Sequence, residues 1–125
     1  MNKTNVALIG LGMVSGTFAD ALGNLTDRIK LKGVFARRPD SRATFREKFP
    51  ALGAAEYTSV DQIAADPDVS FVMLTTPPNA RAEIVQTLAA AGKHVLMEKP
   101  VERTLDAATA LVETCEATGV TLGIM

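Results

Sequence analysis

The chain has 125 residues, 47% of them hydrophobic, and a formal net charge of −1, which is typical of one folded domain with a sizeable core. The near-neutral charge provides no general basic field for nucleic acid or an anionic membrane, and the single cysteine, Cys115, excludes an intrachain disulfide and a cysteine-based metal site. No apolar stretch is long enough to span a membrane and no apolar signal segment precedes residue 5, so we expect a cytoplasmic protein.

The first predicted element is a strand at 5–9, which runs into the glycine-rich turn Gly10–Gly16 and then into a helix at 14–22. Gly10 can adopt a tight turn, and Gly12 has no Cβ, so a phosphate can come close to the backbone there. The helix that follows directs N–H groups and its positive dipole end at such an anion. This order of strand, turn and helix is typical of a dinucleotide-binding βαβ unit.

The turn departs from the strict G-x-G-x-x-G pattern, which would place a glycine at position 15, where this chain has Ser15. The third glycine serves close packing of the helix on the strand, and serine is small enough to be tolerated there. Alone the motif is weak, because a strand–helix turn that binds no ligand can contain the same glycines. The helix after the turn is expected to bury Phe18, Leu22 and Leu25.

The next part of the chain continues the alternation of strands and helices. Pro39 suits the first position of the second helix, in which Phe45 and Phe49 form an i,i+4 apolar pair. Pro50 then ends that helix. The elements expected here are a strand at 30–36, a helix at 39–49, a short strand at 54–57, and a short helix at 60–65 with Ser59 and Gln62 as a capping box.

Residues 69–75 form an almost unbroken apolar run, which predicts a central parallel strand buried on both faces. A helix at 79–91 and strands at 94–98 and 120–125 complete the pattern, with a last helix between Thr104 as its cap and Gly119 at its end. The expected inner faces are Ile84, Val85, Leu88 and Ala91 on the first of these helices, and Leu105, Ala108, Leu111, Val112 and Cys115 on the second.

Strict alternation of strands and helices predicts an α/β fold with a parallel sheet between two helical layers. Right-handed crossovers and a dinucleotide turn favour a doubly wound, Rossmann-type sheet with strand order 3-2-1-4-5-6. The ligand of such a sheet binds at the carboxyl ends of its strands. Those ends carry residues 10–13, 36–38, 75–78 and 98–100, so the chemically interesting stretches are expected at one edge.

Three stretches together resemble the Gfo/Idh/MocA family of nicotinamide-dependent oxidoreductases: 6–16, the T-T-P-P-N-A-R segment at 75–81, and the A-G-K-H-V-L-M-E-K-P segment at 91–100. The resemblance covers the whole chain but only the N-terminal half of the family, whose members usually continue into a larger α/β domain that binds substrate and forms oligomers. Residues 1–125 are therefore expected to be the dinucleotide-binding domain, which alone binds cofactor with little or no turnover.

The resemblance also implies roles for individual residues. The backbone at Gly12, Met13 and Val14 would hold the cofactor pyrophosphate, next to the turn at Gly10. Thr76, Pro77 and Asn79, beside Thr75, would line the ribose and nicotinamide side of the cofactor. Glu98 and Lys99 would reach the nicotinamide ribose, and Lys99 would also meet the substrate. Family members often carry histidine where Arg81 stands, so no role is assigned to Arg81.

Lys99 is the candidate catalytic residue, because it ends a strand immediately before Pro100. Its ammonium could donate a hydrogen bond to a substrate oxygen or relay a proton, and the alternative is a surface lysine at a strand end. Glu98 is either a ligand contact or the ion-pair partner of Lys99. The single histidine, His94, starts a strand and is expected to be structural, and Cys115 is expected in the core.

The end of the second strand predicts which dinucleotide is preferred. Enzymes of this fold that prefer NAD place Asp or Glu there to accept from the ribose 2′-hydroxyl, whereas this chain has Ala36, Arg37 and Arg38. Ala36 repels no phosphate, and the two arginines can donate to phosphate oxygens, so NADP(H) is expected over NAD(H). Arg42, one turn into the next helix, would add positive field, while Arg46 belongs to a solvated face.

Two functions remain open from the sequence. The first is the cofactor-binding part of an oxidoreductase that transfers a hydride between nicotinamide and a carbinol or carbonyl carbon, for example of a sugar or cyclitol. The second is a non-catalytic module that binds dinucleotide as a sensor or regulator, because the fold alone does not decide function. We also expect self-association through the apolar sixth strand at the sheet edge, and no nucleic acid or membrane as a partner.

Overall fold

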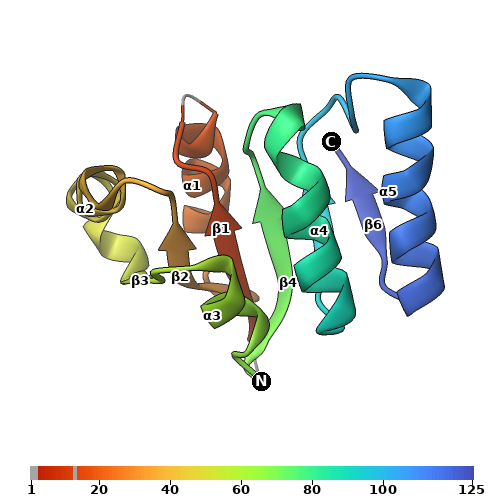
Figure 1. Cartoon of the computed structure of the whole chain (residues 1–125). Coiled ribbons are helices and arrows are strands. Elements are labelled where there is room, and N and C mark those ends of the chain that lie inside the picture. Colours follow the sequence, from red (N-terminus) through yellow and green to blue (C-terminus); the bar gives the residue numbers. More distant parts are fainter. Residues whose placement is uncertain (1–2, 13) are drawn as a thin grey trace.

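In residues 3–12 and 14–125, which the computed structural model describes, six strands form one parallel sheet in the order β3-β2-β1-β4-β5-β6. This confirms the predicted fold class and strand order. Figure 1 shows the arrows of β1, β2, β4 and β6 pointing toward the same edge, which is therefore the carboxyl edge of the sheet. The strands are β1 (Thr4–Ile9), β2 (Ile29–Phe35), β3 (Ala55–Glu56), β4 (Val69–Leu74), β5 (His94–Met97) and β6 (Leu122–Ile124).

Helices cover the two faces of the sheet. One face packs against α1 and α2, and the opposite face packs against α3, α4 and α5 (Figure 1). Short 3₁₀ turns at Pro50–Leu52 and Pro78–Ala80 precede β3 and α4. The helices are α1 (Ser15–Gly23), α2 (Pro39–Lys48), α3 (Val60–Ala64), α4 (Arg81–Ala90) and α5 (Leu105–Thr118).

Strand β1 separates the two cores. Val6 and Leu8 lie in the cluster with α1 and α2, whereas Ala7 and Ile9 lie in the cluster with α3, α4 and α5. None of these four side chains is more than 1% exposed. Successive side chains of a strand point to opposite faces, so an unbroken apolar run is what a central strand between two helical layers requires.

Several local sequence signals have their expected contacts. Thr104 Oγ1 accepts a 3.1 Å hydrogen bond from the Ala107 backbone N–H at the start of α5, and Gly119 ends α5 with a φ of +75°. Only half of the predicted capping box forms at α3. Ser59 Oγ accepts from the Gln62 N–H at 3.0 Å, but Gln62 Oε1 accepts from the Thr58 N–H at 2.7 Å, one residue earlier than the motif specifies.

The apolar stripe predicted for α5 is wrong at two positions. Leu111 and Cys115 are buried, but Leu105 is 82% exposed and Val112 is 37% exposed. Each residue advances an α-helix by about 100°. Leu105 and Val112 therefore lie about 80–100° around the helix from the centre of the face that Leu111 and Cys115 bury. The predicted core position of Cys115 is confirmed, and burial raises the pKa of its thiol.

Three other burial predictions fail. Leu25 follows the end of α1 in a turn and is 38% exposed, and Ala91 lies beyond the last residue of α4 and is exposed. In α4, Ala89 is buried instead. Strand β4 is not buried on both faces throughout, because Ser70 is exposed and Phe71 is half-buried near its amino end.

The amino edge of the sheet is held by a polar network around Asp66, in the turn between α3 and β4. Its carboxylate accepts from Lys32 Nζ and from the Tyr57 hydroxyl, both at 2.8 Å. Lys93, which is 7% exposed, donates to the carbonyl oxygens of Asp66 and Val69 at 2.6 and 2.8 Å. The predicted structural role of His94 agrees with a 2.9 Å bond that its Nδ1 accepts from the Thr121 N–H.

Within the described part of the chain, the helices are all too short or too polar to cross a membrane.

Candidate functional site

Four loops meet at the carboxyl edge, one after each of β1, β2, β4 and β5. One residue that the sequence predicted for the site, Met13, lies outside the described residues, and these loops contain all the others. The others are Gly10, Gly12 and Val14 after β1, Ala36, Arg37 and Arg38 after β2, Thr75, Thr76, Pro77 and Asn79 after β4, and Glu98 and Lys99 after β5.

Gly10 and Gly12 are required for different reasons. Gly10 has a φ of +93°, and a Cβ added there would lie 2.8 Å from the Thr76 nitrogen and 2.9 Å from Thr75 Oγ1. Its role is therefore to let the turn after β1 pass close to the end of β4. A Cβ at Gly12 would meet nothing within 4 Å. The space beside Gly12 is open, as the approach of a phosphate group requires.

Ser15, the departure from the glycine pattern, contributes a contact that glycine lacks. It is 5% exposed, and its Oγ donates a 2.7 Å hydrogen bond to the Gly12 carbonyl oxygen, whose other donor is the Ser15 backbone N–H at 3.2 Å. Helix α1 then begins with Val14 as its N-cap residue and has neither a side-chain cap bond nor an acidic residue in its first turn. The positive end of α1 is therefore left for an anion.

The two threonines after β4 have different surroundings. Thr75 Oγ1 lies 2.6 Å from the Gly10 carbonyl oxygen and 3.2 Å from that of Ile9, so this hydroxyl is committed to the backbone of the first turn. Thr76 Oγ1 is a buried polar atom without a hydrogen-bond partner in the described part of the chain. Buried hydroxyls are normally paired, so Thr76 presents unused hydrogen-bonding capacity at this edge.

Lys99 is exposed, and backbone hydrogen bonds tie it and the preceding Glu98 to the ends of the two neighbouring strands. Its N–H donates to the Met125 carbonyl at 3.3 Å, and the N–H of Glu98 donates to the Leu74 carbonyl at 3.1 Å. The peptide bond from Lys99 to Pro100 is cis. Among the residues that the structure describes, Glu98 and Lys99 do not form an ion pair, so the ion-pair alternative for Glu98 is not the arrangement found.

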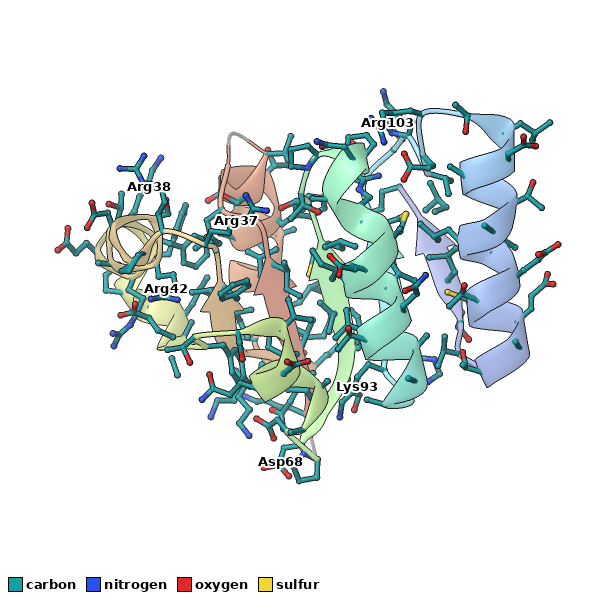
Figure 2. All side chains as sticks on the ribbon, in the orientation of Figure 1. Arg37, Arg38, Arg42, Asp68, Lys93 and Arg103 are labelled. Carbon is teal, nitrogen blue, oxygen red and sulfur yellow. The ribbon has the colours of Figure 1, made fainter. Side chains whose placement is uncertain are left out.

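The arginines after β2 separate into two kinds. Arg37 and Arg38 are exposed, and in Figure 2 their side chains diverge, with Arg38 pointing away from the sheet. Arg38 lies 3.9 Å from Asp40. Arg42 is only 9% exposed and donates to the Tyr57 carbonyl at 3.1 Å, with Glu56 3.4 Å from its Nε. The expectation that Arg42 adds field at the ligand is therefore replaced by a structural role, which joins α2 to the end of β3.

A cavity of about 430 Å³ lies between the glycine turn and α2. Sequence reasoning placed Arg38 and Gly12 there but missed the polar side chains that α2 contributes, which are Asp40 and, on one face, Ser41, Thr44 and Lys48. Their three- and four-residue spacing on one helix was the available signal. The complete lining is Leu11, Gly12, Ser15, Gly16, Arg38, Asp40, Ser41, Thr44, Phe45, Lys48 and Phe49.

Sequence reasoning also left Arg81 without a role, and the structure buries it to 2% exposure at the first position of α4. Its guanidinium donates to the carbonyl oxygens of Thr76 and Pro100, in the loops after β4 and β5. Burial lowers the pKa of this guanidinium, and the carboxylates of Glu102 and Glu98 partly oppose that shift. The two loops are thus joined by one buried cation.

The comparisons with known proteins agree with this geometry. A sequence model of an oxidoreductase family, described as an NAD-binding Rossmann fold (GFO_IDH_MocA), matches residues 4–125. The chain is 27% identical over 124 residues, 99% of its length and 33% of the relative, to scyllo-inositol 2-dehydrogenase (NADP(+)) IolW of Bacillus subtilis. It is 30% identical over 108 residues, 86% of its length and 31% of the relative, to Myo-inositol 2-dehydrogenase of Thermotoga maritima.

A solved structure has the same fold along the whole chain. The WlbA dehydrogenase of Chromobacterium violaceum, in complex with NADH and UDP-GlcNAcA, superposes with a TM-score of 0.91 at 26% identity, covering 100% of this chain and 35% of that one. The chain spans about a third of the length of the curated relatives it matches.

Proposed function

Since the chain belongs to the Gfo/Idh/MocA oxidoreductase family with its NAD-binding Rossmann fold, we propose that it is the dinucleotide-binding domain of an enzyme that transfers a hydride between a nicotinamide cofactor and a carbon bearing a hydroxyl or carbonyl group. Two inositol dehydrogenases and a dehydrogenase bound to UDP-GlcNAcA among the similar proteins support a sugar or cyclitol substrate. The domain's own share of the reaction is to bind and orient the cofactor.

The observation that carries the proposal is the open backbone at Gly12. This glycine leads into the uncapped start of α1 and would accept a Cβ without contact, so nothing on the protein side requires it to be glycine. A pyrophosphate close to the backbone does require it, because a side chain would occupy the same space. The hydroxyl of Thr76, which is buried and without a partner in the described residues, can donate a hydrogen bond on the ribose and nicotinamide side once its side chain turns toward the ligand.

When bound, the nicotinamide ring supplies or accepts the hydride. We propose that Lys99 contacts the substrate oxygen. In the reduction its Nζ donates a hydrogen bond to the carbonyl oxygen and delivers the proton that completes the hydroxyl group. In the reverse reaction the proton returns to Nζ. Exposure of Lys99 at the carboxyl edge, on a backbone held by the Leu74 and Met125 carbonyls, supports this role. Glu98, Pro77 and Asn79 complete the proposed ribose and nicotinamide side.

We further propose a preference for NADP(H), in which Arg37 and Arg38 bind the 2′-phosphate. Both are exposed beyond β2, next to the small Ala36, and Arg38 lines the cavity that also holds Ser41 and Lys48. A 2′-phosphate there has two exposed guanidinium groups within the same loop, which diverge in this structure and would turn toward it on binding, and no acidic residue at the strand end; Asp40, which lies 3.9 Å from Arg38, opposes it weakly from an exposed position. The Bacillus subtilis relative, whose name specifies NADP(+), supports this choice.

Calorimetric titration of the chain with NADP⁺ and NAD⁺ tests the proposal, and two glycine variants make it specific. Gly12→Val and Gly23→Val are matched, because neither glycine has a positive φ and a Cβ at either meets nothing within 4 Å. Gly12→Val is expected to abolish binding and Gly23→Val to preserve it. Absence of binding of either dinucleotide to the wild type at millimolar concentration, or unchanged binding by Gly12→Val, contradicts the proposal.

A further inference from the structure

Arg81 occupies a position that helix energetics disfavour. It is the first residue of α4, where the helix dipole is positive, and it is among the most deeply buried side chains of the described chain, at 2% exposure. Removing a cation from water is costly, and an apolar side chain of similar volume is often no less stable in such a place. The burial of a charge by itself therefore gives no reason for an arginine at this position.

The contacts of Arg81 supply a reason. Its Nε donates a 3.0 Å hydrogen bond to the carbonyl oxygen of Thr76, and its Nη1 donates to that of Pro100. Thr76 follows β4 and Pro100 follows β5, and these strands are neighbours, with Leu74 paired to Met97 at their ends. A planar guanidinium holds its donors in a fixed fork and so restrains the separation of two carbonyl groups more tightly than a lysine ammonium, whose donors rotate.

The two loops that Arg81 joins carry the groups assigned to the cofactor and the substrate. The Thr76 carbonyl oxygen accepts at one end of this bridge, and Lys99 is bonded directly to Pro100, whose carbonyl oxygen accepts at the other end. Upstream, the Lys99 backbone is held by bonds to Met125 and, through Glu98, to Leu74. Downstream, the next residue is Pro100, and its carbonyl oxygen accepts the hydrogen bond from Arg81.

From this geometry we propose that Arg81 is a positioning residue. It couples the loops after β4 and β5 so that Thr76 and Lys99 can contact the same bound dinucleotide and its substrate. The inference rests on the proposed function and adds to it a residue that cannot touch the ligand. At 2% exposure, Arg81 acts through the residues that it contacts, which are the carbonyl groups of Thr76 and Pro100 and, at 4.0 Å, the Met97 sulfur. The nearby carboxylates of Glu98 and Glu102 compensate its charge.

Arg81→Met tests the proposal against a purely structural role, and Lys93→Met is its matched control. Lys93 is also a buried cation, 7% exposed, that donates to two backbone carbonyls, but at the amino edge of the sheet. Figure 2 places Lys93 near Asp68, far along the sheet from Arg37 and Arg103. Both substitutions remove a cation from a bridge between carbonyl groups, so a general loss of stability affects both.

The expected result separates affinity from stability. Measured well below the melting temperature, Arg81→Met binds NADPH at least 10-fold more weakly than the wild type, Lys93→Met binds it within twofold, and Arg81→Lys recovers only part of the loss. We also expect Arg81→Met to lower the melting temperature by no more than Lys93→Met does. NADPH affinity of Arg81→Met within twofold of the wild type, or equal weakening in Lys93→Met, overturns the proposal.

Amide hydrogen exchange in the absence of any dinucleotide distinguishes failure of this inference from failure of the proposed function. In Arg81→Met, exchange of the Glu98 and Lys99 amides should accelerate at least 10-fold, while that of Val72 in the central strand is unchanged. If the wild type binds no dinucleotide, the proposed function fails, and accelerated exchange confined to Glu98 and Lys99 still establishes that Arg81 restrains the loop after β5. Unchanged exchange at Glu98 and Lys99 refutes it.

Discussion

The hydroxyl of Thr75 lies 2.6 Å from the carbonyl oxygen of Gly10 and donates a hydrogen bond to it across 65 residues of sequence. The same threonine donates its backbone N–H to the Ile9 carbonyl at 2.9 Å. The end of β1 with its glycine turn and the loop after β4 are therefore joined by two hydrogen bonds from Thr75. A change in either one moves the other, although only the first has a recognisable glycine motif.

Gly10→Ala is expected to destabilise the fold and abolish dinucleotide binding. Its φ of +93° is unfavourable for alanine, and the new Cβ would lie 2.8–2.9 Å from backbone and side-chain atoms of Thr75 and Thr76. Strain of this kind costs about 1–3 kcal/mol of the free energy of unfolding. Gly16→Ala is the control, because its Cβ would meet only Phe49 Cζ at 3.9 Å. Urea unfolding that shows equal stability for both variants would refute this account.

Asp66 is expected to make stability depend on pH below about 4. The hydrogen bond from Lys32, aided by those from the Asp68 backbone and Tyr57, lowers the pKa of Asp66 from 3.8 to about 2. Because the folded pKa is lower than the unfolded one, this stabilisation is complete above pH 3.8 and is lost as the pH falls toward 2. A shift of this size corresponds to about 2 kcal/mol.

Asp66→Asn should therefore lower the free energy of unfolding at pH 7 by about 2 kcal/mol and flatten its pH dependence between pH 4 and 2. Asp68→Asn is the control, because Asp68 is 67% exposed and its 3.2 Å contact with the same lysine is open to solvent. Exposed pairs contribute at most about 1 kcal/mol. Denaturant titrations at a series of pH values decide between them, and an equally steep pH dependence in Asp66→Asn would assign it to another group.

Arg37→Ala is expected to reduce the preference for NADP(H) over NAD(H). A hydrogen bond to a charged group contributes about 1.5–3 kcal/mol, which at 1.4 kcal/mol per tenfold corresponds to roughly 10- to 100-fold in the ratio of dissociation constants. Arg46→Ala is the control, since the partly exposed Arg46 is already paired with Glu56 of β3 at 3.0 Å. Equal dissociation constants for the two cofactors in the wild type, or a ratio that Arg37→Ala leaves unchanged, would reject the assignment to Arg37.

Lys99→Ala is expected to lower kcat far more than cofactor affinity in an active enzyme that carries this domain. Loss of a positioned acid–base group typically costs about 10²–10⁴-fold in rate. Lys30→Ala removes another exposed lysine, at the amino end of β2, and should leave kcat and cofactor affinity unchanged. Steady-state kinetics together with cofactor titration make the comparison. A kcat unaffected by Lys99→Ala would make Lys99 an ordinary surface residue.

Self-association through β6 is expected for the 125-residue chain. This strand is the last in the sheet order, and Ile124 at its end and Met125 after it are 45% and 40% exposed. Exposed apolar edges pair with other chains, and a lysine on the edge opposes pairing. Sedimentation velocity should therefore show association that rises with concentration and is reduced by Ile124→Lys. A monomer at every concentration would disprove this prediction.

The sequence predicted the sheet and its order because those features depend on local patterns. Apolar runs at 6–9 and 71–74, together with the helices between the strands and right-handed crossovers, leave few alternatives to the parallel order that is found. Turn and cap residues such as Pro39, Thr104 and Gly119 act on neighbouring backbone, so the ends of their helices were predictable within a few residues. The four loops of the site then share one edge by the geometry of parallel strands alone.

The roles of the long cationic side chains were decided by the tertiary structure. Arg42 and Arg81 each occupy a helix beside the site, and the sequence could not separate them from solvated arginines such as Arg38. An arginine or lysine becomes buried only where unpaired carbonyl oxygens from distant segments converge within its reach, as those of Thr76 and Pro100 do around Arg81. That convergence depends on how neighbouring strands end in space, and no spacing within one helix encodes it.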